Sequence, residues 1–153
     1  MSYFAEVLAK EKLTYQDDFF YETIAIATYL KDFRATFFVN QKLFIQLEKM
    51  EDLKIDQKAK SLSKVFAQFS HKDELSGVKY YLIANKSLKG ALFSSLKNFD
   101  FVFIVLSDED DIDVYSLLDK LRDVPDFQAA LHVNKMSKKD ERQLKKLVED
   151  LNT

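Results

Sequence analysis

The most apolar stretch of the chain is hydrophobic at every position, with the sequence FVFIVL over residues 101–106. A strand whose two faces are both apolar is covered by protein on both sides. Residues 78–84, VKYYLIA, have the same two-sided character, with Tyr80 on one face and Tyr81 on the other. The pattern therefore predicts a central strand at 101–106 and a neighbouring strand at 78–84.

Other short segments alternate between apolar and polar positions, as strands with one wet face do. The segment FFYETIAIA is the first of them, and Glu22 and Thr23 make it less apolar than the central strand. We expect strands at 19–27, 44–50, 61–70 and 127–133, and turns or loops at 51–60, 71–77 and 85–98.

A helical period appears in 28–42, where Leu30, Phe33, Phe37 and Phe38 recur at the spacing of one helix face. This pattern predicts an amphipathic helix with those side chains turned inward. Thr28 is an acceptable N-cap for it.

Two further helices are predicted in the second half of the chain. Val114, Leu117, Leu118 and Leu121 recur at i, i+3, i+4 and i+7, and this helix ends before Pro125. The last helix covers 137–151, with Ser137 as its N-cap and Asp140 three residues later. Its inward face is expected to carry Leu144, Leu147, Val148 and Leu151.

These elements predict an α+β fold, with one mostly antiparallel sheet of about six strands packed with three helices. The expected order is β-α-β-β-β-β-α-β-α. Because a helix joins the strands at 101–106 and 127–133, these two strands should run parallel, through a right-handed crossover. The length indicates one domain, 1–153, with 1–18 as a candidate for a loosely attached N-terminal segment.

Composition narrows the function classes. The absence of cysteine excludes disulfides, thiolate metal sites and cysteine nucleophiles. Only two glycines are present, which leaves little room for a glycine-built phosphate loop. A net charge of -2 gives no general attraction to nucleic acid or to anionic membranes. We find no signal-peptide core and no apolar run long enough for a membrane span, and we predict a cytoplasmic location.

Candidate metal and catalytic groups are few. The acidic run at 108–113 lacks the glycine and the distal glutamate of an EF-hand loop, and it is sufficiently explained as the start of a helix. His71 lies in a predicted polar turn and His132 on the polar face of a strand, and neither has a second ligand at metal-site spacing. We therefore assign no catalytic residue, no metal ligand and no cofactor.

Arg34 falls one helical turn after Leu30, inside the predicted apolar stripe. A guanidinium at such a place pairs with a carboxylate, extends to solvent or binds a ligand. Asp100, just before the central strand, is the candidate partner and the interpretation that we favour is a structural ion pair. A polar cluster of Arg34, Asn40, Asn85 and Asp100 is the candidate ligand site or structural cluster.

Aromatic residues are abundant, with 14 phenylalanines and 7 tyrosines. Tyr80, Tyr81, Phe101 and Phe103 on adjacent strands resemble the stacking platforms of proteins that bind single-stranded nucleic acid. If helices cover the sheet, the same residues belong to the hydrophobic core. The interleaved positive and negative charges near the C-terminus favour this core interpretation over nucleic-acid binding. Surplus aromatics can also form an apolar patch for self-association.

Three segments resemble a known family: DFRATFFVNQKL (32–43), YYLIANK (80–86) and FSSLKNFDF (93–101). Together with a closing strand they resemble the small bacterial family named for the motif Ile-Pro-Glu-x-x-x-Val-Asp-Tyr. In the naming motif itself Asp100 is the one identical position. The resemblance implies a compact bacterial cytoplasmic protein and no particular activity, because the family is uncharacterised.

The sequence leaves three functions open. We favour a small non-catalytic binding or assembly module, whose partner is another copy of the chain or another protein. The alternative is a small-ligand-binding protein or enzyme with a site near Arg34, Asn40, Asn85 and Asp100. The third is single-stranded nucleic-acid binding on the aromatic face of the sheet. The charge balance of the chain disfavours this third function.

Overall fold

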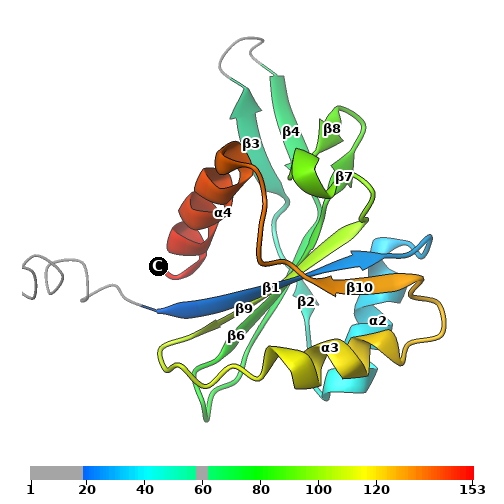
Figure 1. The fold of residues 1–153 in the computed structure, drawn as a ribbon, viewed down its shortest axis with the longest axis vertical. Coiled ribbons are helices and arrows are strands. Elements are labelled where there is room, and N and C mark those ends of the chain that lie inside the picture. The colour runs from blue at the N-terminus through cyan, green and yellow to red at the C-terminus, as the bar shows by residue number, and fades with distance from the viewer. Residues whose placement is uncertain (1–18, 58–61) are drawn as a thin grey trace, which may run out of the picture.

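A computed structural model describes residues 19–57 and 62–153 (Figure 1). The lead-in at 1–18 lies outside the described residues. The elements are β1 (Phe20–Ala27), α2 (Asp32–Leu43), β2 (Glu48–Lys49), β3 (Leu53–Gln57), β4 (Leu62–Phe66), β5 (Gln68–Lys72), β6 (Lys79–Ala84), β7 (Lys86–Ser87), β8 (Gly90–Ala91), a 3-10 helix η1 (Ser94–Leu96), β9 (Phe101–Ser107), α3 (Val114–Arg122), β10 (Ala129–His132) and α4 (Lys138–Leu151).

Six strands form one sheet in the order β10-β1-β9-β6-β5-β2, and each neighbouring pair is antiparallel. Two short hairpins, β3–β4 and β7–β8, stand outside it. With the three helices of the described residues, this is the predicted α+β fold. Among the described residues, none of the helices is both long and apolar enough to cross a membrane.

Strand β9 is central, and all seven of its residues are buried, as its uninterrupted apolar pattern predicts. Its alternate side chains enter two separate cores. Phe103 belongs to the core beneath α2 and α3, whereas Ile104 belongs to the core beneath α4 and the β3–β4 hairpin. Figure 1 shows the same division, with α2 and α3 at one end of the molecule and α4 at the other.

The connection from β9 through α3 to β10 has the predicted direction. β10 is antiparallel to β1, and β1 is antiparallel to β9, so β9 and β10 run parallel with β1 between them. The sequence pattern did not predict that β1 lies between β9 and β10. The first described strand therefore pairs with two strands from the far end of the chain.

The predictions between α2 and β6 were only partly right. Residues 51–60 contain β3 and not only a loop, and the predicted strand at 61–70 is two strands, β4 and β5. The predicted strand at 44–50 is paired only at Glu48–Lys49. Leu53 and Ile55 do alternate and pack against the α4 core, but the charged residues among them concealed the pattern.

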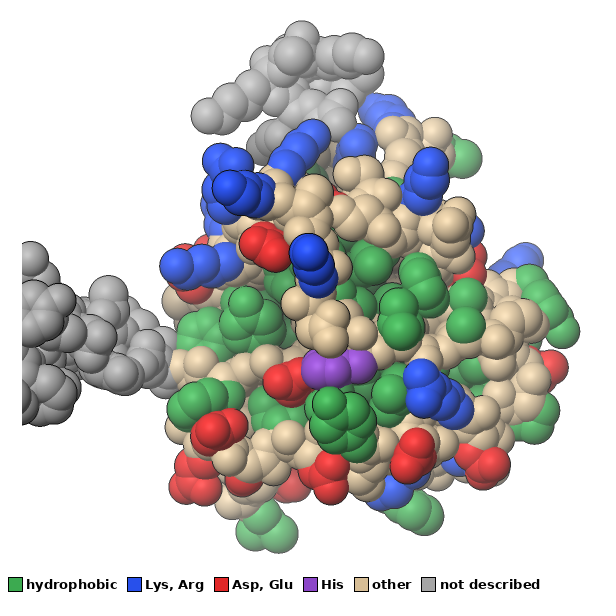
Figure 2. All heavy atoms as spheres, viewed as in Figure 1, with side chains coloured by type: hydrophobic (Ala, Val, Ile, Leu, Met, Phe, Trp, Pro, Cys, Tyr) green, Lys and Arg blue, Asp and Glu red, His purple; other side chains and the backbone are tan. Residues whose placement is uncertain are grey.

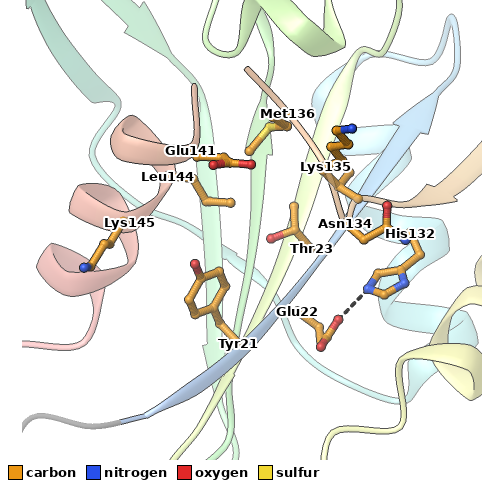
Figure 3. Close-up of a pocket in the computed structure, with 11 residues that line it drawn as sticks. Tyr21, Glu22, Thr23, His132, Asn134, Lys135, Met136, Glu141, Leu144 and Lys145 are labelled. Carbon is orange, nitrogen blue, oxygen red and sulfur yellow. Dashed lines mark hydrogen bonds and ion pairs between the residues drawn. The ribbon is translucent and has the colours of Figure 1, made fainter. Parts of the chain in front are cut away.

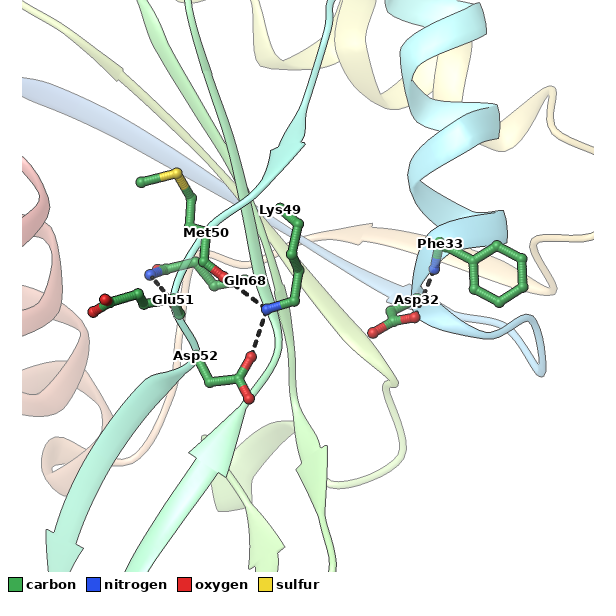
Figure 4. A network of polar contacts seen from close by, with 7 residues as sticks. All are labelled: Asp32, Phe33, Lys49, Met50, Glu51, Asp52 and Gln68. Atoms are coloured by element: carbon green, nitrogen blue, oxygen red, sulfur yellow. Dashed lines mark hydrogen bonds and ion pairs between the residues drawn. The ribbon is translucent and has the colours of Figure 1, made fainter.

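A polar network fixes the point where the β3–β4 hairpin leaves the sheet (Figure 4). The Lys49 ammonium donates to the carbonyl of Met50 at 2.7 Å and contacts the Asp52 carboxylate at 2.5 Å. The Gln68 amide donates to the carbonyl of Glu51 at 3.2 Å. These contacts hold the short chain segment between β2 and β3.

Helix α2 begins later than predicted, and its N-cap is Lys31 rather than Thr28. The Thr28 hydroxyl instead donates to the carbonyl of Asp126 at 2.7 Å and accepts the N–H of Leu30. Thr28 thus joins the end of β1 to the loop before β10.

The caps of the later helices agree with expectation. The Ser137 hydroxyl accepts the N–H of Asp140 at 3.2 Å, and Asp113, from the acidic run, accepts the N–H of Ser116 at 3.1 Å. The Asp140 carboxylate is itself buried and accepts the N–H of Ser95 at 2.7 Å. This hydrogen bond ties the start of helix α4 to the loop before β9.

Candidate functional site

The four predicted site residues do not converge on one pocket. Arg34 is exposed on α2, with its guanidinium carbon 5.6 Å from the centre of the Phe38 ring. The expected ion pair between Arg34 and Asp100 is wrong, because Asp100 pairs with Lys86 at 3.0 Å and accepts the N–H of Thr28 at 2.9 Å. Arg34 extends to solvent because its position lies on the outer side of the helix.

Asn40 and Asn85 both act as structural amides. Asn40 exchanges two hydrogen bonds with the backbone of Leu47, at 2.8 and 3.3 Å, and so holds the loop after α2. Asn85 is completely buried, and its amide donates to the carbonyls of Leu96 and Phe99 and accepts the N–H of Phe93. Among the four, only Asn85 and Asp100 are neighbours, joined through their backbones at 2.8 Å.

The predicted inward face of α2 is only partly right, because Leu30 and Phe38 pack against the core whereas Phe33 and Phe37 turn outward. The residues buried beneath it are small, namely Ala35, Thr36 and Val39. Phe33 is 62% and Phe37 55% exposed. Figure 4 shows the Phe33 ring on the side of α2 that faces away from the polar network.

Phe44 extends this stripe beyond the end of the helix. It is the C-cap of α2, has a φ of 55° in the left-handed region and is 91% exposed. A phenylalanine in that conformation is unfavourable, because its Cβ crowds the backbone where glycine would not. Phe33 and Phe37 lie one turn apart on the exposed side of the helix and Phe44 follows its last residue, and we call these three residues the α2 stripe. Tyr29, 77% exposed, precedes the helix.

A groove of about 480 Å³ lies on the other side of the molecule, between β1, the segment after β10, and α4. It exists because β10 pairs with β1 only from Ile24 to Ala27. After His132 the chain leaves the sheet and crosses to α4, so the first half of β1 forms one wall (Figure 3). Figure 2 shows this side of the molecule, with hydrophobic side chains in the middle, lysine and arginine toward the α4 end and acidic residues toward the opposite end.

The Glu22 carboxylate and the Nε2 atom of the His132 imidazole lie within hydrogen-bond distance, 2.5 Å apart, at one edge of the groove. The ring of Tyr115, from α3, packs edge-on against the His132 imidazole at 5.9 Å. Glu22 and Thr23 are successive residues of a strand, so their side chains point to opposite faces. The Thr23 hydroxyl and the His132 imidazole are therefore not arranged as a nucleophile and its base.

Tyr21 and Thr23 face α4 inside the groove. Burial raises the pKa of the Tyr21 hydroxyl, and the negative charges of Glu141, Glu149 and Glu22 raise it further. Thr23 is 3% exposed, and its hydroxyl oxygen is buried without a hydrogen-bond partner among the described residues. Such an unsatisfied group is uncommon in a native interior.

The remaining candidates have structural surroundings. His71 lies in β5 rather than in a turn, and its ring stacks on Tyr80, which stacks in turn on Phe103. Phe101 and Phe103 are buried, so the aromatic sheet residues lie within the core. Within residues 19–57 and 62–153 no cluster of three histidine, aspartate or glutamate side chains could hold a metal ion.

Few features of the sequence indicate the groove. Glu22 and Thr23 interrupt the apolar pattern of the first strand, and His132 stands on the polar face of the last one. These were the available signals. The local pattern does not show that the first and last strands of the sheet are neighbours. Their pairing brings together Glu22 and His132, which are 110 positions apart in sequence.

No family model, curated protein sequence or solved structure matches this chain. The resemblance to the Ile-Pro-Glu-x-x-x-Val-Asp-Tyr family therefore stays a prediction.

Proposed function

We propose that the protein is a non-catalytic assembly module that pairs with a second copy of itself through the α2 stripe. The observation that carries this proposal is the outward direction of Phe33, Phe37 and Phe44. Single exposed apolar residues are ordinary, but a run of large ones on one helix face is typical of an interface. Aromatic side chains also contribute most to the binding energy of interfaces.

The inward face of α2 supports the same conclusion. Ala35, Thr36 and Val39 are the buried residues of the helix, and Phe38 and Leu43 pack against the same core, while Phe33 and Phe37 remain exposed. Phe44 adds to this, because it keeps a fully exposed ring at a backbone position that favours glycine. Exposed rings at these positions are what a contact outside the monomer would use.

The charges along α2 are compatible with a two-fold pairing. If two α2 helices cross antiparallel about Phe37, Phe33 of one copy lies opposite Gln41 of the other, and Arg34 lies opposite Asn40. No like charges then face each other at these positions. Antiparallel helices also place opposite ends of their dipoles together. A closed two-fold dimer is the commonest form of self-association.

Other functions have less support. The predicted ligand site near Arg34, Asn40, Asn85 and Asp100 is divided between a solvent-exposed arginine and hydrogen bonds that hold the fold. The aromatic face proposed for single-stranded nucleic acid is occupied by the helices that cover it.

Sedimentation velocity over a range of protein concentrations tests the proposal. We expect the wild-type chain to form dimers, and Phe37→Glu or Phe33→Glu to give a monomer with unchanged circular dichroism. Loss of a central aromatic anchor is worth about 2 kcal/mol or more, which is a rise in Kd of about 30-fold.

Leu75→Glu and Leu88→Glu are matched controls, because both leucines are fully exposed but lie in turns far from α2. These variants should dimerise as the wild type does. A wild-type chain that stays monomeric at every concentration would overturn the proposal. So would a dimer that Phe33→Glu and Phe37→Glu leave intact.

A further inference from the structure

The groove between β1 and α4 has properties that the assembly role of α2 does not use. We propose that it binds a small organic molecule through a primary ammonium group carried on a short apolar chain. This inference is independent of the proposed dimer, because the groove and the α2 stripe share no residue.

The polar groups inside the groove are suited to an ammonium ion. Such an ion donates three hydrogen bonds and needs acceptors around it. Figure 3 shows the Tyr21 hydroxyl, the Thr23 hydroxyl and the Glu141 carboxylate around the space between β1 and α4. All three groups can accept, and Glu141 also supplies a negative charge.

Thr23 is the most specific of these observations. Its hydroxyl is buried and has no partner among the described residues, although it belongs to the wall of a groove. Leaving such a group unsatisfied is unfavourable by about 1–3 kcal/mol, and valine would have nearly the same shape without that penalty. A ligand that hydrogen-bonds to the hydroxyl accounts for the presence of threonine.

The charges around Tyr21 favour a cation over an anion. Burial raises the pKa of the Tyr21 hydroxyl most, and the negative charges of Glu141, Glu149 and Glu22 raise it further. Lys135 and Lys145 also line the groove, but Figure 3 shows their ammonium groups pointing away from Tyr21. An anion placed beside Tyr21 would meet the glutamates instead.

The walls and the size indicate a short apolar chain. Val133, Met136 and Leu144 line the groove, and its volume of about 480 Å³ falls within the range of small-molecule sites, roughly 300–1,000 Å³. Glu22 is engaged with His132, which leaves Glu141 as the acidic group that the ligand would contact. The site therefore fits one ammonium group better than two.

Titration of the ¹⁵N-labelled full chain with n-butylammonium, followed by NMR, tests this proposal. We expect shifts that saturate and that concentrate at the amides of Tyr21, Thr23 and Glu141. The neutral analogue n-pentanol should bind at least about tenfold more weakly, since it lacks the charge-assisted hydrogen bonds.

Glu141→Gln keeps the shape of an exposed side chain and should raise the Kd for n-butylammonium by about tenfold or more. Thr23→Val should also raise it while leaving the fold intact, since it removes an unsatisfied hydroxyl. Asp119→Asn, an exposed carboxylate on α3, is the matched control and should bind as the wild type does.

Three results would overturn the proposal: no localised shifts with n-butylammonium, equal binding of n-pentanol, or unchanged binding by Glu141→Gln.

Discussion

Helices α2 and α4 cover opposite faces of the same sheet, and they use their apolar residues in opposite ways. In α4 the long apolar side chains Leu144, Leu147 and Val148 face the sheet, and charged residues face water. In α2 the small residues face the sheet, and Phe33 and Phe37 face water. The difference teaches that helical periodicity identifies apolar residues without saying which of them face the core and which face water.

The two helices are also anchored differently. Helix α4 depends on a buried core and on caps at its start, through Ser137 and Asp140. Helix α2 has no side-chain N-cap, and its end is held by the hydrogen bonds of Asn40 to Leu47. Substitutions that test this contrast should therefore affect the stability of the monomer strongly in α4 and weakly on the outer side of α2.

The largest effect is expected when the inner face of α4 is compared with the outer face of α2. Leu147→Ala should lower the free energy of unfolding by about 2–5 kcal/mol, because it leaves a cavity in the α4 core. Phe37→Ala should change it by no more than about 0.5 kcal/mol when measured at a concentration where the chain is monomeric. Urea unfolding followed by circular dichroism measures both. Equal losses would show that the Phe37 ring stabilises the monomer.

The next effect concerns the buried carboxylate of α4. Asp140→Ala should destabilise the protein by about 1–3 kcal/mol, because the N–H of Ser95 loses its acceptor. The adjacent Glu141→Ala is the control and should stay within about 0.5 kcal/mol, since that side chain is exposed. The same unfolding assay applies, and a neutral Asp140→Ala would contradict this account of how α4 is attached.

A smaller loss is expected at the N-cap of α4. Ser137→Ala should lower the free energy of unfolding by about 1 kcal/mol, because the N–H of Asp140 is left without its hydroxyl acceptor. Ser137→Asp should retain most of the wild-type free energy of unfolding, since aspartate is an equally good N-cap. Failure of the aspartate variant to recover stability would show that the serine acts in another way.

The smallest change is a gain. Phe44→Gly should stabilise the monomer by up to about 1 kcal/mol, because glycine tolerates the left-handed conformation. Phe44→Ala, which keeps the unfavourable conformation and removes the ring, should not stabilise it. Both variants should weaken the proposed dimer in sedimentation velocity. A dimer as strong as that of the wild type would remove Phe44 from the interface.

The sequence predicted best where one signal dominated. The continuous apolar run of β9 and the regular spacing of Leu144, Leu147 and Val148 were both assigned correctly. The sequence predicted the strands least well where strand pairing decides which residues belong to which sheet. Residues 61–70 look like one strand, yet β4 pairs with β3 and β5 pairs with β6, so the chain divides between two sheets near Ala67.

The candidate sites were hidden for the same reason. Arg34 was expected inside the apolar stripe of its helix, but the helix turns Arg34 outward together with the neighbouring Phe33. Asp100 pairs instead with Lys86, which lies only fourteen positions away in sequence. Tertiary neighbours, rather than local spacing, decide which polar groups meet.

The place of β1 has a consequence for how the protein is made. Its register sets Phe20 opposite Ser107 and Ile24 opposite His132, so both of its neighbours are synthesised long after it. During translation this strand has both edges unpaired until nearly the whole chain has left the ribosome. Contacts so distant in sequence fold slowly, and exposed strand edges aggregate. The growing chain is therefore expected to need protection from chaperones until its last third has emerged.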